Sequence, residues 1–126
     1  MGKKVITSEK APAAIGPYSQ AIKTKELVFV SGQLPINAFT GTMPEGVEEQ
    51  AKQSLENLKN ILDQIGLTME EVVKTTVFLK DLNNFNIVNE VYGKYFTQGY
   101  PARSAVQVAR LPKDAEIEIE AIAICE

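Results

Sequence analysis

The sequence predicts one α+β domain that extends over residues 1–126. A chain of this length has the size of a typical single domain and buries roughly two-thirds of its unfolded surface. Its apolar residues alternate with a period of two in some segments and recur every three or four residues in others, which indicates strands and helices around one core. No internal repeat or linker-like segment interrupts the pattern. A second domain therefore does not fit.

The first third of the chain predicts three strands. Residues 4–7 form a short strand candidate, and two prolines and a glycine in the segment 11–17 exclude regular structure there. Two further strands, 18–24 and 27–31, are joined by a two-residue turn. Because the second of these is apolar on both faces, we expect it to be a central strand that ends at Gly32.

The middle of the chain predicts a long helix and then a strand. Apolar residues spaced three and four apart draw one stripe on a helix from Val47 to Ile65, and Gly66 supplies the stop. Residues 68–71 have the spacing of a capping box, which allows one helical turn. The β-branched run that follows predicts a strand as far as Lys80.

A second helix and a hairpin are expected in the rest of the chain. The helix runs from about Asn84 to Thr97, and Gly99 and Pro101 break it. Its buried side is predicted to carry Phe85, Val88, Val91, Tyr92, Tyr95 and Phe96. The segments 103–110 and 116–125 alternate and are β-branched, so they predict the two arms of a hairpin around a turn at 111–114.

Composition excludes several kinds of chemistry. The chain has no His, which removes Ser-His and Cys-His nucleophile pairs and every His-containing metal site. One cysteine, Cys125, allows no internal disulfide or cysteine-cluster zinc site, and a small apolar strand residue is its expected role. The net charge of −3 opposes binding to nucleic acid or anionic lipid. We therefore expect carboxylates, Arg, Lys, Tyr, hydroxyls and backbone groups to do the chemistry, with no metal and no cofactor.

The N-terminus does not have the pattern of a secretory signal. Residues 1–10 carry charges but are not followed by an apolar stretch of the required length, and no run of the sequence is long enough to cross a bilayer. The cytoplasm is the expected compartment, with no membrane partner.

The closing strand carries the clearest candidate for chemistry. Its period of two places Glu116, Glu118 and Glu120 on one face, and that face becomes apolar at Ile122 and Ile124. One interpretation is a solvent-facing edge whose far end is covered. The other places at least one Glu at the rim of a partly desolvated cleft, beside an Arg from the preceding arm.

Arg103 is the stronger of the two arginine candidates. It follows the rigid entry 99–102 and sits among small and apolar residues, where an unpartnered cation is costly. Its guanidinium suits bidentate binding of a carboxylate. Arg110, next to the turn, is expected to be solvated or paired at the surface. Arg103 shares a face with Glu118 only if the hairpin has an odd-sum register, contains a bulge, or is completed by another subunit.

Separate motifs run nearly end to end along the chain, in segments 11–20, 30–33, 73–78, 88–92, 101–104, 111–114 and 118–121. Together these motifs closely resemble the RidA (YjgF) family of reactive-intermediate deaminases. Their common order makes the resemblance specific, above all Pro-Ala-Arg-Ser and the later Ile-Glu-Ile-Glu. It implies a chorismate-mutase-like α+β fold, with two helices on one face of a mixed sheet and a homotrimeric barrel with a cleft at each subunit interface.

The resemblance also implies a reaction and its residues. The reaction is hydrolysis of 2-imino acids, derived from enamines that PLP-dependent dehydratases release, to 2-oxo acids and ammonia. Arg103 would bind the substrate carboxylate, and Glu118 would position water and move a proton. The remaining pocket residues implied by the resemblance are Tyr18, Ser31, Gly32, Asn89, the backbone at Ala105, and Phe85 as an apolar wall.

One position departs from the family pattern, and two other functions remain open. Many relatives have Cys two residues after the Arg, where this chain has Ala105. Because imine hydrolysis needs no covalent step, we expect a backbone group to serve at this position. The alternatives to a deaminase are a trimeric module that binds 2-oxo acids without turnover, and a ribonuclease or translation inhibitor, which the acidic charge and the absence of His disfavour.

Overall fold

A six-stranded sheet is the framework of the molecule, in the order β1-β2-β3-β6-β4-β5. The computed structural model of the chain describes residues 2–125. The strands are β1 (Lys4–Ile6), β2 (Ala21–Lys23), β3 (Leu27–Gln33), β4 (Val72–Leu79), β5 (Ala102–Gln107) and β6 (Ile117–Ile124). All neighbours are antiparallel except β4 and β5, which are parallel. The sheet is therefore mixed, as the family resemblance implied.

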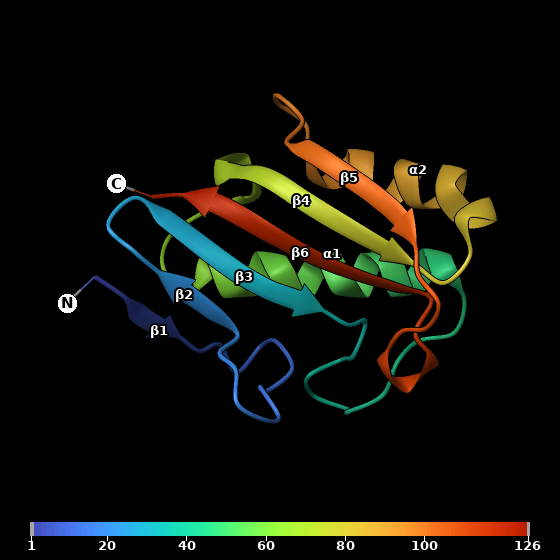
Figure 1. Cartoon of the computed structure of the whole chain (residues 1–126), viewed down its shortest axis with the longest axis horizontal. Helices are drawn as coiled ribbons and strands as arrows, with labels where there is room; N and C mark the ends of the chain where they lie inside the picture. The colour runs from blue at the N-terminus through green and yellow to red at the C-terminus, as the bar shows by residue number, and fades with distance from the viewer. Residues whose placement is uncertain (1, 126) are drawn as a thin grey trace.

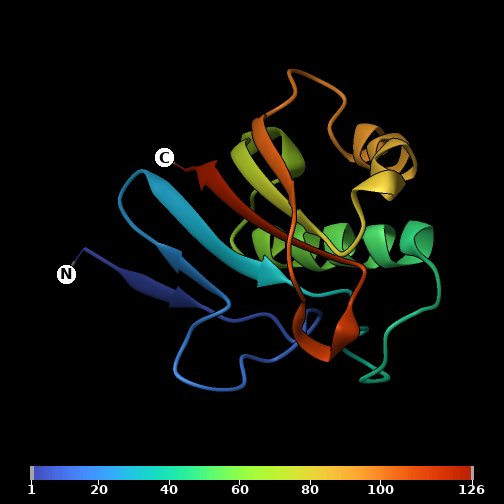
Figure 2. The same cartoon turned by 45° about the vertical axis from the view of Figure 1, so that its right-hand side comes forward.

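Two helices, α1 (Val47–Asp63) and α2 (Phe85–Tyr95), lie on the same face of this sheet. Figure 1 shows α1 behind the central strands and α2 behind β5, and the turned view in Figure 2 shows the opposite face without a helix over it. The stripe of α1 is fully buried at Ala51, Leu55 and Leu58, where it packs against the core. None of the helices within residues 2–125 has the length and hydropathy needed to cross a bilayer.

Most of the expected elements are confirmed with small shifts of their ends. Gly66 follows α1 with a φ of +75°, in the left-handed region that favours glycine. The expected single turn is the 3₁₀ helix Met69–Glu71, and its Thr68 capping box is present. The expected strand 18–24 is shorter, because only Ala21–Lys23 pair with β3. The second helix begins at Phe85 and ends at Tyr95.

The predicted hairpin between the last two strands is wrong. β6 lies between β3 and β4, while β5 pairs with β4 at the edge of the sheet. A further 3₁₀ turn, Pro112–Asp114, contains Lys113 and Asp114 at positive φ and redirects the chain away from β5. Alternation in sequence reports which faces of a strand are buried, but it does not report which strand is the neighbour. The outer face of β6 carries Glu118 and Glu120 toward its start and becomes apolar at Ile122 and Ile124.

The expectation that β3 ends at Gly32 is also wrong. The strand continues to Gln33, with Val30 opposite Ala121 and Gln33 opposite Ile119 on β6. Three steps along β3 therefore match two steps along β6, which is a β-bulge at Ser31 and Gly32. A bulge redirects the strand without ending it, and it commonly occurs beside a functional site.

Candidate active site

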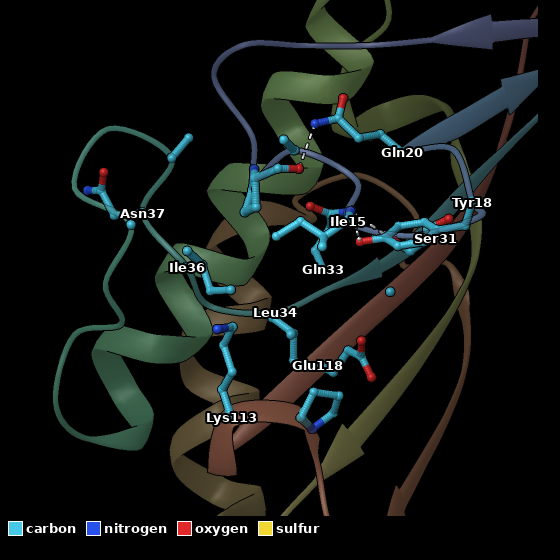
Figure 3. Close-up of a pocket in the computed structure, with 16 residues that line it drawn as sticks. Ile15, Tyr18, Gln20, Ser31, Gln33, Leu34, Ile36, Asn37, Lys113 and Glu118 are labelled. Carbon is cyan, nitrogen blue, oxygen red and sulfur yellow. Dashed lines mark hydrogen bonds between the residues drawn. The ribbon is translucent and has the colours of Figure 1, made fainter.

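A cavity of about 710 Å³ opens beside the bulge of β3 and the start of β6. Figure 3 shows its walls, which come from the N-terminal loop, the loop after β3 and the turn before β6. Apolar side chains on these walls include Ile15, Leu34 and Ile36, and Glu118 supplies a carboxylate. Most of the cavity wall is therefore apolar around one acidic group.

The two loops are held in place by buried amide side chains. Gln20 Nε2 donates to the carbonyl oxygens of Ser8 at 3.1 Å and Pro12 at 2.7 Å, which fixes the N-terminal loop. Asn57 Nδ2, on α1, donates to the carbonyl oxygens of Leu34 at 3.0 Å and Ile36 at 2.9 Å. Because backbone groups in loops need such partners when buried, these amides define the cavity walls.

Gly32 lies against the Glu118 carboxylate. A Cβ atom at position 32 would lie 2.6 Å from Glu118 Oε2 and 2.8 Å from its carboxyl carbon. Real Cβ atoms do not approach other heavy atoms so closely, so any larger residue would displace the carboxylate. Glycine at the bulge therefore leaves the space in which the carboxylate sits.

The Glu118 carboxylate is half-buried and has no compensating partner. Burial, with a smaller contribution from the negative charge of Glu120, raises the pKa of Glu118. Among residues 2–125 no group donates a hydrogen bond to this carboxylate. A carboxyl group with these properties takes up and releases a proton closer to neutral pH than an exposed glutamate does. Two neighbouring acids differ, since Glu116, just before β6, lies 3.9 Å from Lys80, and Glu120, on β6, is exposed.

Two other predicted site residues line the same cavity. The Tyr18 hydroxyl accepts a hydrogen bond from the Ile15 backbone N–H at 3.4 Å, and its ring is 53% exposed at the mouth. Ser31 Oγ donates to the Ser19 carbonyl oxygen at 2.6 Å, so this hydroxyl ties β3 to the N-terminal loop. The structure thus brings Tyr18, Ser31, Gly32 and Glu118 together.

Arg103 lies in a separate cavity of about 450 Å³, between β5 and α2. Its Nη1 donates to Asn89 Oδ1 at 2.8 Å. Its Cζ lies 5.2 Å from the centroid of the Phe85 ring and 4.8 Å from that of Tyr92. These three partners are spaced i, i+4 and i+7 along α2, so one helix face holds the cation.

Within one chain, Arg103 and Glu118 do not form one site. Arg103 is opposite Thr75 on β4, which is opposite Ala121 on β6. Two strand spacings and three residues along β6 therefore separate the two backbone positions, roughly 14 Å. The Arg103 side chain reaches α2 on the helix-covered face, whereas Glu118 alternates with the buried Ile117 and Ile119 and points to the other face. Of the three routes that would join them, the intrachain hairpin register and its bulge are excluded, because β5 and β6 do not pair.

The remaining candidates have simpler surroundings. Ala105, on β5, is opposite Val77, packs partly buried against the core and lines neither of the two cavities. Arg110 is exposed, as expected. Cys125 is buried at 6% exposure, and its Sγ lies 3.8 Å from the carbonyl oxygens of Thr24 and Lys25. Within residues 2–125 no three acidic or cysteine side chains gather as a metal site.

The sequence interpretation did not recognise Tyr92 and Gln20. Tyr92 was expected in the core, and it is 4% exposed, yet its ring also faces the Arg103 guanidinium. The signal for it is the spacing of Phe85, Asn89 and Tyr92 along one helix face. Gln20 follows a segment rich in proline and small residues, but its hydrogen bonds to that segment have no sequence signature.

The sequence model of the family described as Endoribonuclease L-PSP matches residues 8–125. The 2-iminobutanoate/2-iminopropanoate deaminase of Escherichia coli strain K12 is 53% identical over 124 residues, which are 96% of this chain and 97% of that protein. The chain belongs to the RidA/YjgF family. Both the family match and the relative cover almost its whole length.

Solved RidA/YjgF structures have the same fold. The crystal structure of the E. coli YjgF gene product is 52% identical with a TM-score of 0.94, over 98% of this chain and 99% of that one. The crystal structure of E. coli TdcF with bound serine is 48% identical with a TM-score of 0.93, over 98% and 99% of the two chains. The six-stranded mixed sheet with two helices is therefore the RidA/YjgF fold.

Proposed function

We propose that this protein hydrolyses small 2-imino acids, such as 2-iminobutanoate and 2-iminopropanoate, to 2-oxo acids and ammonia. The observation that carries the proposal is the unpaired, half-buried Glu118 carboxylate, held against Gly32 in an apolar cavity. Relatives at 53% and 54% identity, from E. coli and Salmonella typhimurium, carry the name 2-iminobutanoate/2-iminopropanoate deaminase. A structure of the relative TdcF contains serine, which is an amino acid of comparable size.

The chemistry needs few groups. The carbon of a protonated C=N bond is already electrophilic, so a water molecule adds to it directly and forms a C–O bond. In our proposal Glu118 accepts a proton from this water and passes it to the nitrogen, after which the C–N bond breaks and ammonia leaves. The electron pair of the broken bond goes to nitrogen, the hydroxyl group formed from the water gives its remaining proton to the Glu118 carboxylate, and the carbon becomes the carbonyl of the 2-oxo acid. No cofactor or covalent nucleophile takes part.

We propose that Arg103 of one subunit and Glu118 of a neighbouring subunit act on the same substrate. Arg103 would bind the substrate carboxylate and so orient the imine carbon toward the water held by Glu118. The position of the two side chains on opposite faces of one sheet supports a site shared between chains. The homotrimer expected from the sequence supplies such a neighbour.

The uncovered sheet face supports this assembly. One row of cross-strand neighbours on that face consists of Val5, Ile22, Phe29 and Ile122. Val5 is 55% exposed and Phe29 is 43% exposed, as is expected for an interface seen without its partner. Burying these side chains against a second copy is favourable, at about 25 cal/mol per Å² of apolar surface.

The other residues have supporting roles in the proposed site. Tyr18 and Ser31 would line the substrate side of the Glu118 cavity, and Gly32 would leave room for the carboxylate. Asn89 and Phe85 would hold Arg103 rather than the substrate itself, which refines the expectation from the sequence. The backbone at Ala105 would reach the substrate only in the assembled trimer. We further propose that PLP-dependent dehydratases in the cytoplasm supply the substrate.

The proposal is tested by generating 2-aminocrotonate with threonine dehydratase and following the formation of 2-oxobutanoate. The unmodified protein should accelerate this step. Arg103→Ala should lose roughly 10- to 100-fold in affinity for the substrate, because a charge-assisted contact is removed. The matched control is Arg110→Ala, which removes an exposed arginine and should change the rate little. An unaccelerated reaction, or equal rates for Arg103→Ala and the unmodified protein, would refute the proposal.

A mixing experiment tests whether neighbouring chains share the site. With the substrate kept well below saturation, Arg103→Ala and Glu118→Gln chains are each expected to keep at most about one tenth of the unmodified activity alone. When equal amounts are unfolded and refolded together, about one quarter of the junctions should combine an intact Arg103 with an intact Glu118. Activity should therefore return to about one quarter of the unmodified level. No recovery in a mixture with the sedimentation mass of a trimer would contradict a shared site.

The same measurements separate the other two functions. A module that only binds 2-oxo acids would give calorimetric binding of 2-oxobutanoate without acceleration of the dehydratase product. The family description names an endoribonuclease, but the net charge of −3 opposes binding to RNA. Ribonuclease activity that survives Arg103→Ala and disappears on further purification would come from a contaminant.

A further inference from the structure

We propose that Tyr92 is a positioning residue for Arg103, because its buried ring, tied to β4 through Thr75, sets the orientation in which the guanidinium receives a carboxylate. This inference rests on the proposed function, in which Arg103 is the anion-binding group. It adds a residue that the sequence pattern assigns to the core alone.

The guanidinium of Arg103 has three partners, and all of them come from α2. Asn89 Oδ1 accepts a hydrogen bond from Nη1 at 2.8 Å, and the rings of Phe85 and Tyr92 lie 5.2 Å and 4.8 Å from Cζ. Asn89 is bonded to Nη1 alone, so the N–H groups of Nη2 and Nε remain for a ligand. Bidentate binding requires two of these N–H groups to face the carboxylate in one plane, and the surrounding rings restrict that plane.

The Tyr92 ring is itself fixed at both ends. Its hydroxyl and Thr75 Oγ1 are 2.7 Å apart in a buried hydrogen bond, and Thr75 is 0% exposed. Thr75 is the residue of β4 opposite Arg103, so the ring is anchored beside the cation that it contacts. The Phe96 ring packs at a centroid distance of 4.6 Å. Tyr92 therefore cannot move aside without breaking a buried hydrogen bond.

The hydroxyl of Tyr92 does not serve as an acid or base in this arrangement. Burial raises the pKa of Tyr92, although the hydrogen bond with Thr75 and the charge of Arg103 act in the opposite direction. The hydroxyl is bonded to Thr75 in the interior, and the part of Tyr92 that meets Arg103 is the ring. Its effect on a substrate is therefore transmitted through Arg103.

The test uses calorimetric titration of the unmodified full-length protein and its variants with 2-oxobutanoate, so that binding is measured without turnover. Tyr92→Leu should weaken binding by roughly 3- to 30-fold, the range expected when a desolvated cation–π contact is lost. Tyr92→Phe keeps the ring against the guanidinium but loses the hydrogen bond to Thr75, so it should weaken binding less than Tyr92→Leu does, by about threefold or less. The control is Val91→Ala, a buried neighbour on α2, which should lower thermal stability and leave binding unchanged.

A double variant separates positioning from general damage to the fold. If Tyr92 acts through Arg103, then adding Tyr92→Leu to Arg103→Ala should cause no further loss of binding. Each variant is compared only at the sedimentation mass of the unmodified protein, and Tyr92→Met replaces Tyr92→Leu if the latter does not reach it. Unchanged binding by the Tyr92 variant, equal losses with and without Arg103, or a Tyr92→Phe variant as weak as Tyr92→Leu would each overturn the inference.

The results also separate this inference from the proposed function. Imine hydrolysis by the unmodified protein with no effect of Tyr92→Leu on binding would overturn the inference alone. Binding that depends on Tyr92 without any imine hydrolysis would support the inference and overturn the proposed function. Failure of the unmodified protein to bind 2-oxobutanoate would overturn both.

Discussion

Arg103 and Glu118 differ in how the chain surrounds each charge. Arg103 donates to Asn89 at 2.8 Å and contacts two aromatic rings, whereas Glu118 receives no hydrogen bond from any group among residues 2–125. The cation is held rigidly by one helix face. The carboxylate is held only by lack of space, because Gly32 leaves room for it and the cavity is mostly apolar.

This difference matches two tasks in our proposal. A group that orients a substrate works best when its geometry is fixed before binding, so that little freedom is lost on association. A group that moves protons needs a pKa near the working pH, and an unpaired, partly buried carboxylate has a raised pKa. We therefore expect changes around Arg103 to affect substrate binding and changes around Glu118 to affect turnover. The substitutions below are ordered from the largest expected effect to the smallest.

The largest effect is expected from Glu118→Gln. Glutamine keeps the shape but cannot take up a proton, so imine hydrolysis should fall by roughly 100- to 10,000-fold. Binding of 2-oxobutanoate, which depends on Arg103, should change little. The dehydratase-coupled assay and calorimetry measure the two quantities, and Glu116→Gln, just before β6 at a carboxylate near Lys80, is the control. If Glu118→Gln lost binding and turnover together, Arg103 and Glu118 would not have separate tasks.

Thermal unfolding is the measurement that checks whether the Glu118→Gln variant is folded. The ordinary pKa of a glutamate carboxyl group is 4.5, and the pKa of Glu118 is higher in the folded chain. Above pH 4.5 the carboxyl group therefore ionises more readily in the unfolded chain, which destabilises the folded state. Replacement by Gln should therefore raise the melting temperature at pH 7. This gain should disappear as the pH falls below 4.5, where the carboxyl is protonated in both folded and unfolded chains.

Gly32→Ala should have the next largest effect. The added methyl group would lie 2.6 Å from Glu118 Oε2, so the carboxylate must move. A displacement of this kind is expected to lower turnover by about 100-fold while binding through Arg103 persists. Gly2→Ala, where a Cβ meets nothing within 4 Å, is the matched control. Full activity of Gly32→Ala would show that the position of Glu118 is not critical.

The smallest effect is expected from Glu120→Gln. This change removes a negative charge that contributes to the raised pKa of Glu118. The pKa of Glu118 should therefore decrease, and the limb of the pH–rate profile that reports it should shift to lower pH. The rate at the optimum should change by only about twofold to threefold, because an exposed charge is screened by solvent. A profile that does not move would assign the limb to another group.

The sequence was sufficient where a pattern is local and insufficient where the sheet order decides. The stripe of α1, the Thr68 capping box and the alternation of β6 all follow from spacing. The partner of β5 does not follow from spacing, because an alternating strand can pair with β4 or with β6. The helix α2 separates β4 from β5 in the sequence, although the two strands pair directly in the sheet. The bulge at Gly32 is also hidden, since one extra residue changes the register and leaves the composition of the strand unchanged.

The parallel pairing of β4 and β5 has a consequence for how the molecule is assembled. Thr75, the three partners of Arg103 on α2 and Arg103 itself belong to one continuous β-α-β stretch, whereas Gly32 and Glu118 meet only when distant parts of the chain come together. Contacts between residues near in sequence lose less chain entropy on closure and tend to form earlier in folding. We therefore expect a nascent or partly unfolded chain to place Arg103 against α2 first. Glu118 should reach its position beside Gly32 only when β3 and β6 pair.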